Sequence, residues 1–130
     1  MEEALGSPSV QAAATRPHWR EVYACTPIGD RLLEGYVDLL YRSPAGLVVV
    51  DHKTSATDHP AELDRRVAGY RLQGAAYALA VRRATAEPVV RVAFLFLTPK
   101  GAVTRELTDL EAAIAEVERL VAAGEELVTA

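Results

Sequence analysis

The residues best suited to chemistry lie in two short motifs near the middle of the chain. Gly35-Tyr36-Val37-Asp38 is followed, after twelve residues, by Asp51-His52-Lys53-Thr54. Carboxylate oxygens are ligands that Mg²⁺ and Mn²⁺ prefer, and a lysine ammonium is a compact charge suited to phosphate. If the two motifs meet, they could form a metal site beside a phosphate-binding cation.

Two β-strands are expected to carry these motifs. Residues 31–42 alternate, and one predicted face carries Glu34, Tyr36, Asp38 and Leu40. Residues 47–50 form a short apolar run, which is typical of a strand covered on both sides. Beyond this run, Asp51 and Lys53 should point the same way and His52 the other way.

The connection between the strands, Ser43-Pro44-Ala45-Gly46, has the composition of a tight turn. If Ser43 faces Gly46, antiparallel pairing joins residues whose numbers sum to 89, although another loop type would shift this register. The pairing sets Asp38 opposite Asp51, with Cβ atoms about 4.5–5.5 Å apart. The sequence therefore predicts that two carboxylates and Lys53 converge at the end of a buried strand.

Two carboxylates in this position need an explanation, because like charges directly opposite each other destabilise a sheet. Either one carboxyl stays protonated or a cation lies between them. A simpler alternative is that Asp51 ends its strand and pairs with Lys53. The position of Asp38 and the helix that follows favour the functional interpretation.

One long helix is expected over residues 60–84. Its apolar stripe, at spacings of three and four, consists of Leu63, Val67, Tyr70, Gly74, Tyr77 and Val81. A narrow sector along the edge of that stripe carries Arg66, Tyr70, Gln73 and Tyr77. Gln73 and Tyr77 are one turn apart, so an amide and a phenol can reach the same place beside the carboxylates. The alternative is a plain core helix with packed tyrosines.

Other elements complete the predicted α/β fold. A short helix is expected over residues 10–16 and a strand over residues 18–26. Residues 89–98 suit a central strand, parallel to the one that ends at Asp51, and residues 102–107 a short strand. Residues 108–111 match a capping box that opens a last helix. Its predicted buried face is formed by Leu110, Ile114, Val117 and Val121.

Composition narrows the class of protein. The chain has 130 residues and a net charge of −4, which does not suggest a standalone nucleic-acid binder. Its single cysteine, Cys25, excludes an internal disulfide and a cysteine-rich zinc site. No Gly-rich phosphate loop, nucleophile elbow, signal peptide or membrane-spanning run is evident, so we expect a cytoplasmic protein with no membrane contact.

The two motifs and the segment 70–77 together resemble the RecB-like nucleases of the PD-(D/E)XK superfamily. The resemblance covers roughly residues 7–98 and is greatest to the C-terminal nuclease domain of bacterial RecB/AddA-type helicase–nucleases. It implies a restriction-endonuclease-like fold, a mixed and mainly antiparallel sheet of about five strands flanked by helices.

The resemblance also implies a catalytic site for hydrolysing DNA phosphodiesters. Asp38 and Asp51, with the backbone carbonyl of His52, would hold Mg²⁺ or Mn²⁺. The metal would lower the pKa of a bound water and neutralise charge on the phosphate. Lys53 would stabilise the attacking hydroxide and the phosphate.

Further implications concern DNA and partner proteins. By resemblance, Gln73 and Tyr77 would help to orient DNA and the catalytic residues. The expected context is an exonuclease-type domain in recombinational repair, with helicase domains in cis or in a partner subunit.

Two departures from the family pattern leave an alternative open. His52 stands where the family often has Tyr or Phe, and no His or Glu upstream of Asp38 matches a further metal ligand of the family. We therefore expect residues 1–130 to be a single nuclease-like domain lacking its N-terminal portion. With the acidic net charge, the same departure also fits a non-catalytic module that binds DNA or docks within a helicase complex.

Overall fold

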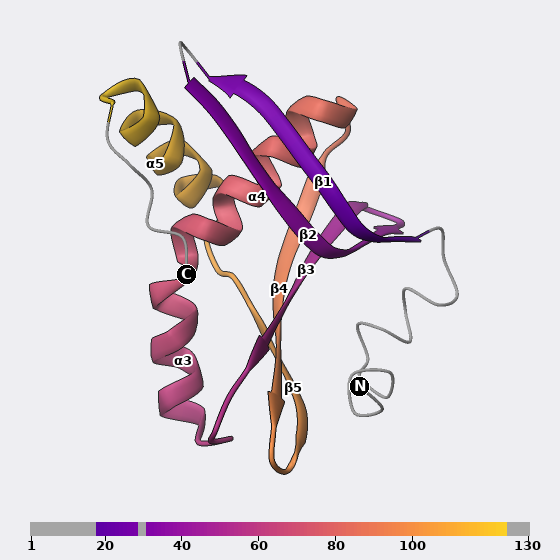
Figure 1. The fold of residues 1–130 in the computed structure, drawn as a ribbon, viewed down its shortest axis with the longest axis vertical. Coiled ribbons are helices and arrows are strands. Elements are labelled where there is room, and N and C mark those ends of the chain that lie inside the picture. The colour runs from indigo at the N-terminus through magenta and orange to yellow at the C-terminus, as the bar shows by residue number, and fades with distance from the viewer. Residues whose placement is uncertain (1–17, 29–30, 125–130) are drawn as a thin grey trace.

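The computed structural model describes residues 18–28 and 31–124, which form one sheet and the helices beside it (Figure 1). The strands are β1 (His18–Ile28), β2 (Arg31–Ser43), β3 (Gly46–Thr54), β4 (Val89–Thr98) and β5 (Gly101–Glu106). The helices are α3 (Pro60–Gly69), α4 (Arg71–Thr85) and α5 (Leu110–Ala122). The strands lie in sequence order, and only β3 and β4 pair in parallel. The predicted mixed, mainly antiparallel sheet is confirmed, whereas the helix predicted at 10–16 lies outside the described residues.

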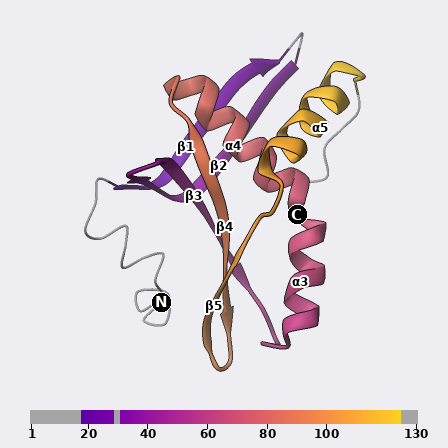
Figure 2. The ribbon, with the colours of Figure 1, turned by 180° about the vertical axis from the view of Figure 1, so that it is seen from behind.

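The helices cover one face of the sheet (Figures 1 and 2). There α4 crosses behind the β1–β2 ribbon, α5 lies beside α4, and α3 runs along the lower half of the molecule near β5. Their apolar side chains join the helix-facing residues of the strands in the main core. On the opposite face, the described residues of a second cluster all come from strands: Leu39, Tyr41, Val48, Val50, Ala93 and Leu95.

Strand β3 is buried on both faces, as its apolar run predicts. Leu47 and Val49 belong to the main core, and Val48 and Val50 belong to the second cluster. A strand buried in this way cannot shift its register without exposing apolar side chains. It therefore holds the residues that follow Val50 in a defined place.

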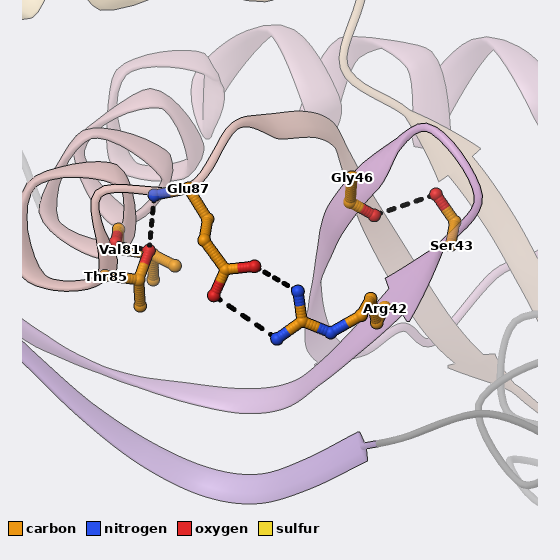
Figure 3. A network of polar contacts seen from close by, with 6 residues as sticks. All are labelled: Arg42, Ser43, Gly46, Val81, Thr85 and Glu87. Carbon is orange, nitrogen blue, oxygen red and sulfur yellow. Dashed lines mark hydrogen bonds and ion pairs between the residues drawn. The ribbon is translucent and has the colours of Figure 1, made fainter.

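The turn between β2 and β3 has the predicted pairing. Ser43 faces Gly46, and the register whose numbers sum to 89 continues as far as Leu39 opposite Val50. The Ser43 hydroxyl donates a 2.8 Å hydrogen bond to the Gly46 carbonyl, and Gly46 has a φ of +148° that favours glycine. Beside this turn, Arg42 and Glu87 form a two-pronged ion pair that ties the turn to the loop after α4 (Figure 3).

Strand β2 does not keep the single face that its alternation predicts. Val37 and Leu40 both pack into the main core, so the strand changes face between them. Opposite Asp38, Glu21 of β1 has a φ of +54°, and these two residues do not pair although their neighbours do. A left-handed residue breaks the two-residue alternation of β1, and the face switch of β2 lies directly opposite it, at Asp38.

The single helix predicted over residues 60–84 is wrong, because the structure has two helices there. α3 ends at Gly69, Tyr70 has φ −97° and ψ 4°, and α4 then runs in a different direction (Figure 1). Glycine is a poor helix former, and a helix can end where packing favours a change of direction. The break places Tyr70 at the junction of the two helices.

The predicted capping box before the last helix is also wrong. α5 begins at Leu110, and Asp109 has left-handed angles, φ 54° and ψ 47°, with no side-chain cap. A capping side chain needs extended backbone angles, which Asp109 does not have. The predicted apolar face is confirmed, because Ile114 and Val117 are buried and Leu110 packs against them.

Two smaller features concern the single cysteine and the helices. Cys25 is only partly buried in β1. Among the described helices, none combines the length and the apolar character needed to cross a bilayer.

Candidate active site

Asp38 lies where strands β2 and β3 stop pairing. The last pair is Leu39 opposite Val50, so Asp38 and Asp51 are the next residue on each strand. The Asp38 carboxylate, through Oδ2, accepts a 2.7 Å hydrogen bond from the backbone N–H of His52. A side chain of β2 thus takes the place that a backbone carbonyl would hold in a continued ladder. This bond holds the Asp38 carboxylate against the end of β3.

Asp51 is the buried carboxylate of the site, with 7% of its side chain exposed. Its Oδ2 lies 3.1 Å from the ammonium of Lys53, but no donor is aligned for a hydrogen bond to that oxygen. Burial, helped by the neighbouring Asp38 carboxyl, raises the pKa of Asp51 to about 6, although the Lys53 charge acts in the opposite direction. Asp51 is therefore a carboxylate whose charge is not fully compensated by the protein.

Lys53 joins the strand end to the two helices. Its ammonium donates a 3.0 Å hydrogen bond to Oε1 of Gln73 and lies 4.2 Å from the ring centroid of Tyr70. The Lys53 ammonium is thus surrounded by the carboxylate of Asp51, the amide oxygen of Gln73 and the aromatic face of Tyr70. Only 13% of the Lys53 side chain is exposed. The ammonium is thereby held at a defined position, with donor capacity left for a further acceptor.

Gln73 and Tyr77 extend this network along α4. The amide of Gln73 accepts from Lys53 and donates a 3.3 Å hydrogen bond to the Tyr77 hydroxyl. Burial raises the pKa of Tyr77, and the charges of Asp51 and Asp38 raise it further, while the Gln73 bond lowers it. The phenol therefore stays protonated at neutral pH and can donate a hydrogen bond.

Gly35 explains how Tyr77 reaches this place. A Cβ atom at position 35 would lie 2.4 Å from Cε1 of Tyr77, well inside van der Waals contact. The tyrosine ring lies directly on the β2 backbone, three residues before Asp38. Glycine in the first motif is thus required by close packing against α4.

Comparison with known proteins identifies the family. The family model described as the PD-(D/E)XK nuclease superfamily matches residues 2–129. The chain belongs to the PD-(D/E)XK nuclease superfamily. Among curated proteins no match was found.

Two solved structures share the fold of this nuclease-superfamily chain. A candidate exonuclease from Eubacterium rectale has a TM-score of 0.62 at 20% identity, with 94% of this chain and 51% of that chain covered. The protein SSO0001 has a TM-score of 0.52 at 15% identity, with 97% and 59% covered. At these identities the likeness shows the fold, and this chain spans between half and three fifths of the length of either structure.

The donor set at the strand end fits the divalent cation that nucleases of this superfamily typically use. It offers an orphaned carboxylate oxygen on Asp51 and a second carboxyl on Asp38, close enough to raise the pKa of Asp51. Oxygen donors of this kind suit hard cations. Within the described ranges, no group of three His, Cys, Asp or Glu side chains could hold a metal. Within these ranges, further ligands would be backbone oxygens, water or substrate.

The structure brings together all five side chains that the sequence analysis predicted for the candidate site. Asp38, Asp51, Lys53, Gln73 and Tyr77 lie around one point at the end of β3, while the His52 ring does not contribute. Their roles in catalysis stay a prediction.

Sequence reasoning did not assign a role to Tyr70 or Arg66. Tyr70 lies under the Lys53 ammonium, and Arg66 donates a hydrogen bond to the Tyr70 hydroxyl. The sequence signal that could have indicated both residues is their spacing, four residues from Arg66 to Tyr70 and three from Tyr70 to Gln73.

Proposed function

We propose that this chain hydrolyses DNA phosphodiester bonds with the help of a divalent metal ion. The observation that carries the proposal is the convergence of Asp38, Asp51 and Lys53 at the open end of the β2–β3 ladder. A pair of carboxylates can bind a cation, especially because the buried Asp51 carboxylate lacks a hydrogen-bond donor on one oxygen. The adjacent Lys53 ammonium can bind a phosphate.

Each residue has a distinct role in this proposal. Asp38, Asp51 and the backbone carbonyl of His52 would hold Mg²⁺ or Mn²⁺; the carbonyl is assigned by analogy with the family. The metal supplies a bound water of lowered pKa and neutralises charge on the phosphate. Lys53 donates to a phosphate oxygen as negative charge develops there, and Gln73 holds Lys53 in place by accepting from its ammonium.

Tyr77 would act on the substrate. Its protonated hydroxyl accepts from Gln73 and keeps its own O–H for a further acceptor, such as a backbone phosphate of DNA. By analogy with the family, the products carry 5′-phosphate and 3′-hydroxyl ends.

The biological context that we propose is an exonuclease-type domain of a bacterial helicase–nuclease in recombinational repair. Its partners would be DNA and helicase domains, in cis or in a partner subunit, in the cytoplasm. The E. rectale structure, described as a candidate exonuclease, supports an exonuclease-type domain. We propose that residues 1–130 form one such domain without its N-terminal portion.

A second candidate function is a nuclease-fold module that binds DNA or docks in a helicase complex without cleaving. Two observations favour it: the described residues supply only two carboxylates to the site, and the chain carries a net charge of −4. Metal binding separates the two candidates, because a module that never cleaves does not need the carboxylate pair to bind Mg²⁺.

The test is Mg²⁺ and Mn²⁺ binding by calorimetry, combined with DNA cleavage, on wild type and Asp51→Asn. We expect millimolar or tighter binding that is lost in the variant, and metal-dependent cleavage that is lost with it. Asp64→Asn is a matched control, because Asp64 pairs with Arg105 away from the site. Equal metal binding by wild type and Asp51→Asn would contradict the catalytic proposal and favour the module.

A further inference from the structure

Arg66 of α3 differs from most of the arginines around it. Among the described residues, seven other arginines form ion pairs with carboxylates: Arg42, Arg65, Arg71, Arg82, Arg83, Arg105 and Arg119. In the described part of the chain, the recorded partners of Arg66 are neutral oxygens and aromatic rings. Its positive charge is therefore not compensated by a neighbouring carboxylate.

The guanidinium of Arg66 is held beside Lys53. One nitrogen donates a 2.8 Å hydrogen bond to the Thr54 carbonyl, directly after Lys53, and the other donates a 3.1 Å bond to the Tyr70 hydroxyl. Its carbon also lies 5.2 Å from the ring centroid of Phe96. These contacts fix the position of the group and use two of the five N–H donors of a guanidinium.

Tyr70 contacts both cations. The Lys53 ammonium lies 4.2 Å from its ring centroid, and the Arg66 guanidinium carbon lies 5.7 Å from the same centroid. Both cations are attracted to the aromatic face, whereas their like charges produce a mutual repulsion. An anion that spans both charges would remove it.

We propose that Arg66 binds a second backbone phosphate of the DNA substrate, next to the phosphate that Lys53 contacts. This proposal rests on the function proposed above and adds the groups that set the position of the strand. A guanidinium with free N–H donors binds phosphate oxygens in a two-pronged geometry, and such contacts fix the position of the backbone without reading the base. Tyr70 keeps the two cations at a constant separation.

A purely structural role for Arg66 makes a different prediction. The bond to Thr54 anchors α3 to the end of β3, so its loss could lower the stability of the fold and activity together. A phosphate contact instead changes the salt dependence of DNA binding, because each neutralised phosphate releases counterions. The slope of log Kd against log salt concentration separates the two roles.

The experiment measures DNA binding and cleavage by the full chain with Arg66→Gln, and Arg65→Gln is the matched control. Arg65 is the neighbouring residue, loses the same charge, and lies on the exposed side of α3 paired with Glu62. We expect Arg66→Gln to weaken binding roughly tenfold at every sequence and to reduce the salt slope by about one, while kcat at saturating DNA changes little. Arg65→Gln should leave both quantities close to those of wild type.

A chemical test on the DNA locates the contact. Single phosphates are replaced in turn by uncharged methylphosphonates, and binding by wild type and Arg66→Gln is compared. When the phosphate at one position beside the cleaved bond is replaced, wild type and Arg66→Gln should bind the DNA with the same affinity. A difference that persists at all positions, or equal salt slopes for Arg66→Gln and Arg65→Gln, overturns the proposal. DNA binding that depends on Arg66 without any cleavage would overturn the catalytic function and leave this contact standing.

Discussion

The two ends of the β2–β3 pair solve opposite electrostatic problems. At the turn end, Arg42 and Glu87 form a two-pronged ion pair with side chains 42% and 37% exposed, so water and the partner both stabilise each charge (Figure 3). At the other end, Asp51 and Lys53 are nearly buried, and one Asp51 oxygen has no hydrogen-bond donor.

The two ends differ in how much their charges cost the folded chain. Exposed ion pairs contribute little to stability, and this one ties a turn to the loop beside it. Buried charges that lack full compensation cost free energy, and proteins keep them where a ligand or a reaction needs them. The following changes test that contrast.

The largest effect is expected for Lys53→Ala. Without its ammonium, charge that develops on the phosphate is not stabilised, so we expect cleavage to fall by about 10²–10³-fold or more. Circular dichroism should show an intact fold. Lys100→Ala serves as the control. The Lys100 side chain is 80% exposed, and its ammonium lies 3.9 Å from the Asp58 carboxylate. Normal cleavage by Lys53→Ala would rule out the mechanism.

A second effect concerns the pH dependence of stability. The pKa of Asp51 is raised to about 6 in the folded chain, above its usual value of 3.8, so the folded state binds this proton more tightly than the unfolded state. The stabilisation is complete below pH 3.8 and is lost as the pH rises through 6.

Chemical denaturation of metal-free wild type and Asp51→Asn can measure this loss. Between pH 4 and pH 8, the free energy of unfolding of wild type should fall by on the order of 2–3 kcal/mol relative to that of the variant. A constant difference across this range would show that Asp51 is not held in a site that disfavours its charge.

An intermediate effect is expected for Gly35→Ala. The new Cβ meets the Tyr77 ring at 2.4 Å, so the ring must leave its present position beside Gln73. We expect a loss of about 1–3 kcal/mol in the free energy of unfolding, together with weaker cleavage.

Two further variants isolate the cause. At Gly69 an added Cβ meets nothing within 4 Å, so Gly69→Ala should not destabilise the fold. Adding Tyr77→Leu to Gly35→Ala should recover stability without recovering cleavage. Full activity in Gly35→Ala would mean that the position of Tyr77 is not needed.

The smallest effect is expected at the turn end. Arg42→Ala removes an exposed ion pair, so thermal unfolding should change only slightly. Cleavage and metal binding should equal those of wild type. A large loss of activity in this variant would show that the two ends of β3 are not independent.

Much of the local structure could be predicted from the sequence. The turn residues 43–46 and the apolar run 47–50 were sufficient for the register, because a buried strand that shifts by one residue exposes its core side. The spacing of Gln73 and Tyr77 likewise placed an amide and a phenol on one edge of a helix. These features depend on short-range geometry.

The features that were missed depend on distant contacts. The left-handed Glu21 and the face switch at Asp38 involve two strands, and the break at Tyr70 lets α4 lie against β2 and β4. The left-handed Asp109 cannot be read from its neighbours either. At Tyr70, the packing of α4 on the sheet outweighed the local helix propensity.

The sequence by itself determined the order of the strands, the register of the β2–β3 pair and the residue types that could do chemistry. Only the tertiary structure decided that Asp38 bonds to the His52 backbone, that Gly35 gives Tyr77 its place, and that Arg66 and Lys53 lie against one tyrosine ring. The physical reason is that spacing along the chain sets which side chains share a face, whereas their distances and burial depend on what packs against that face.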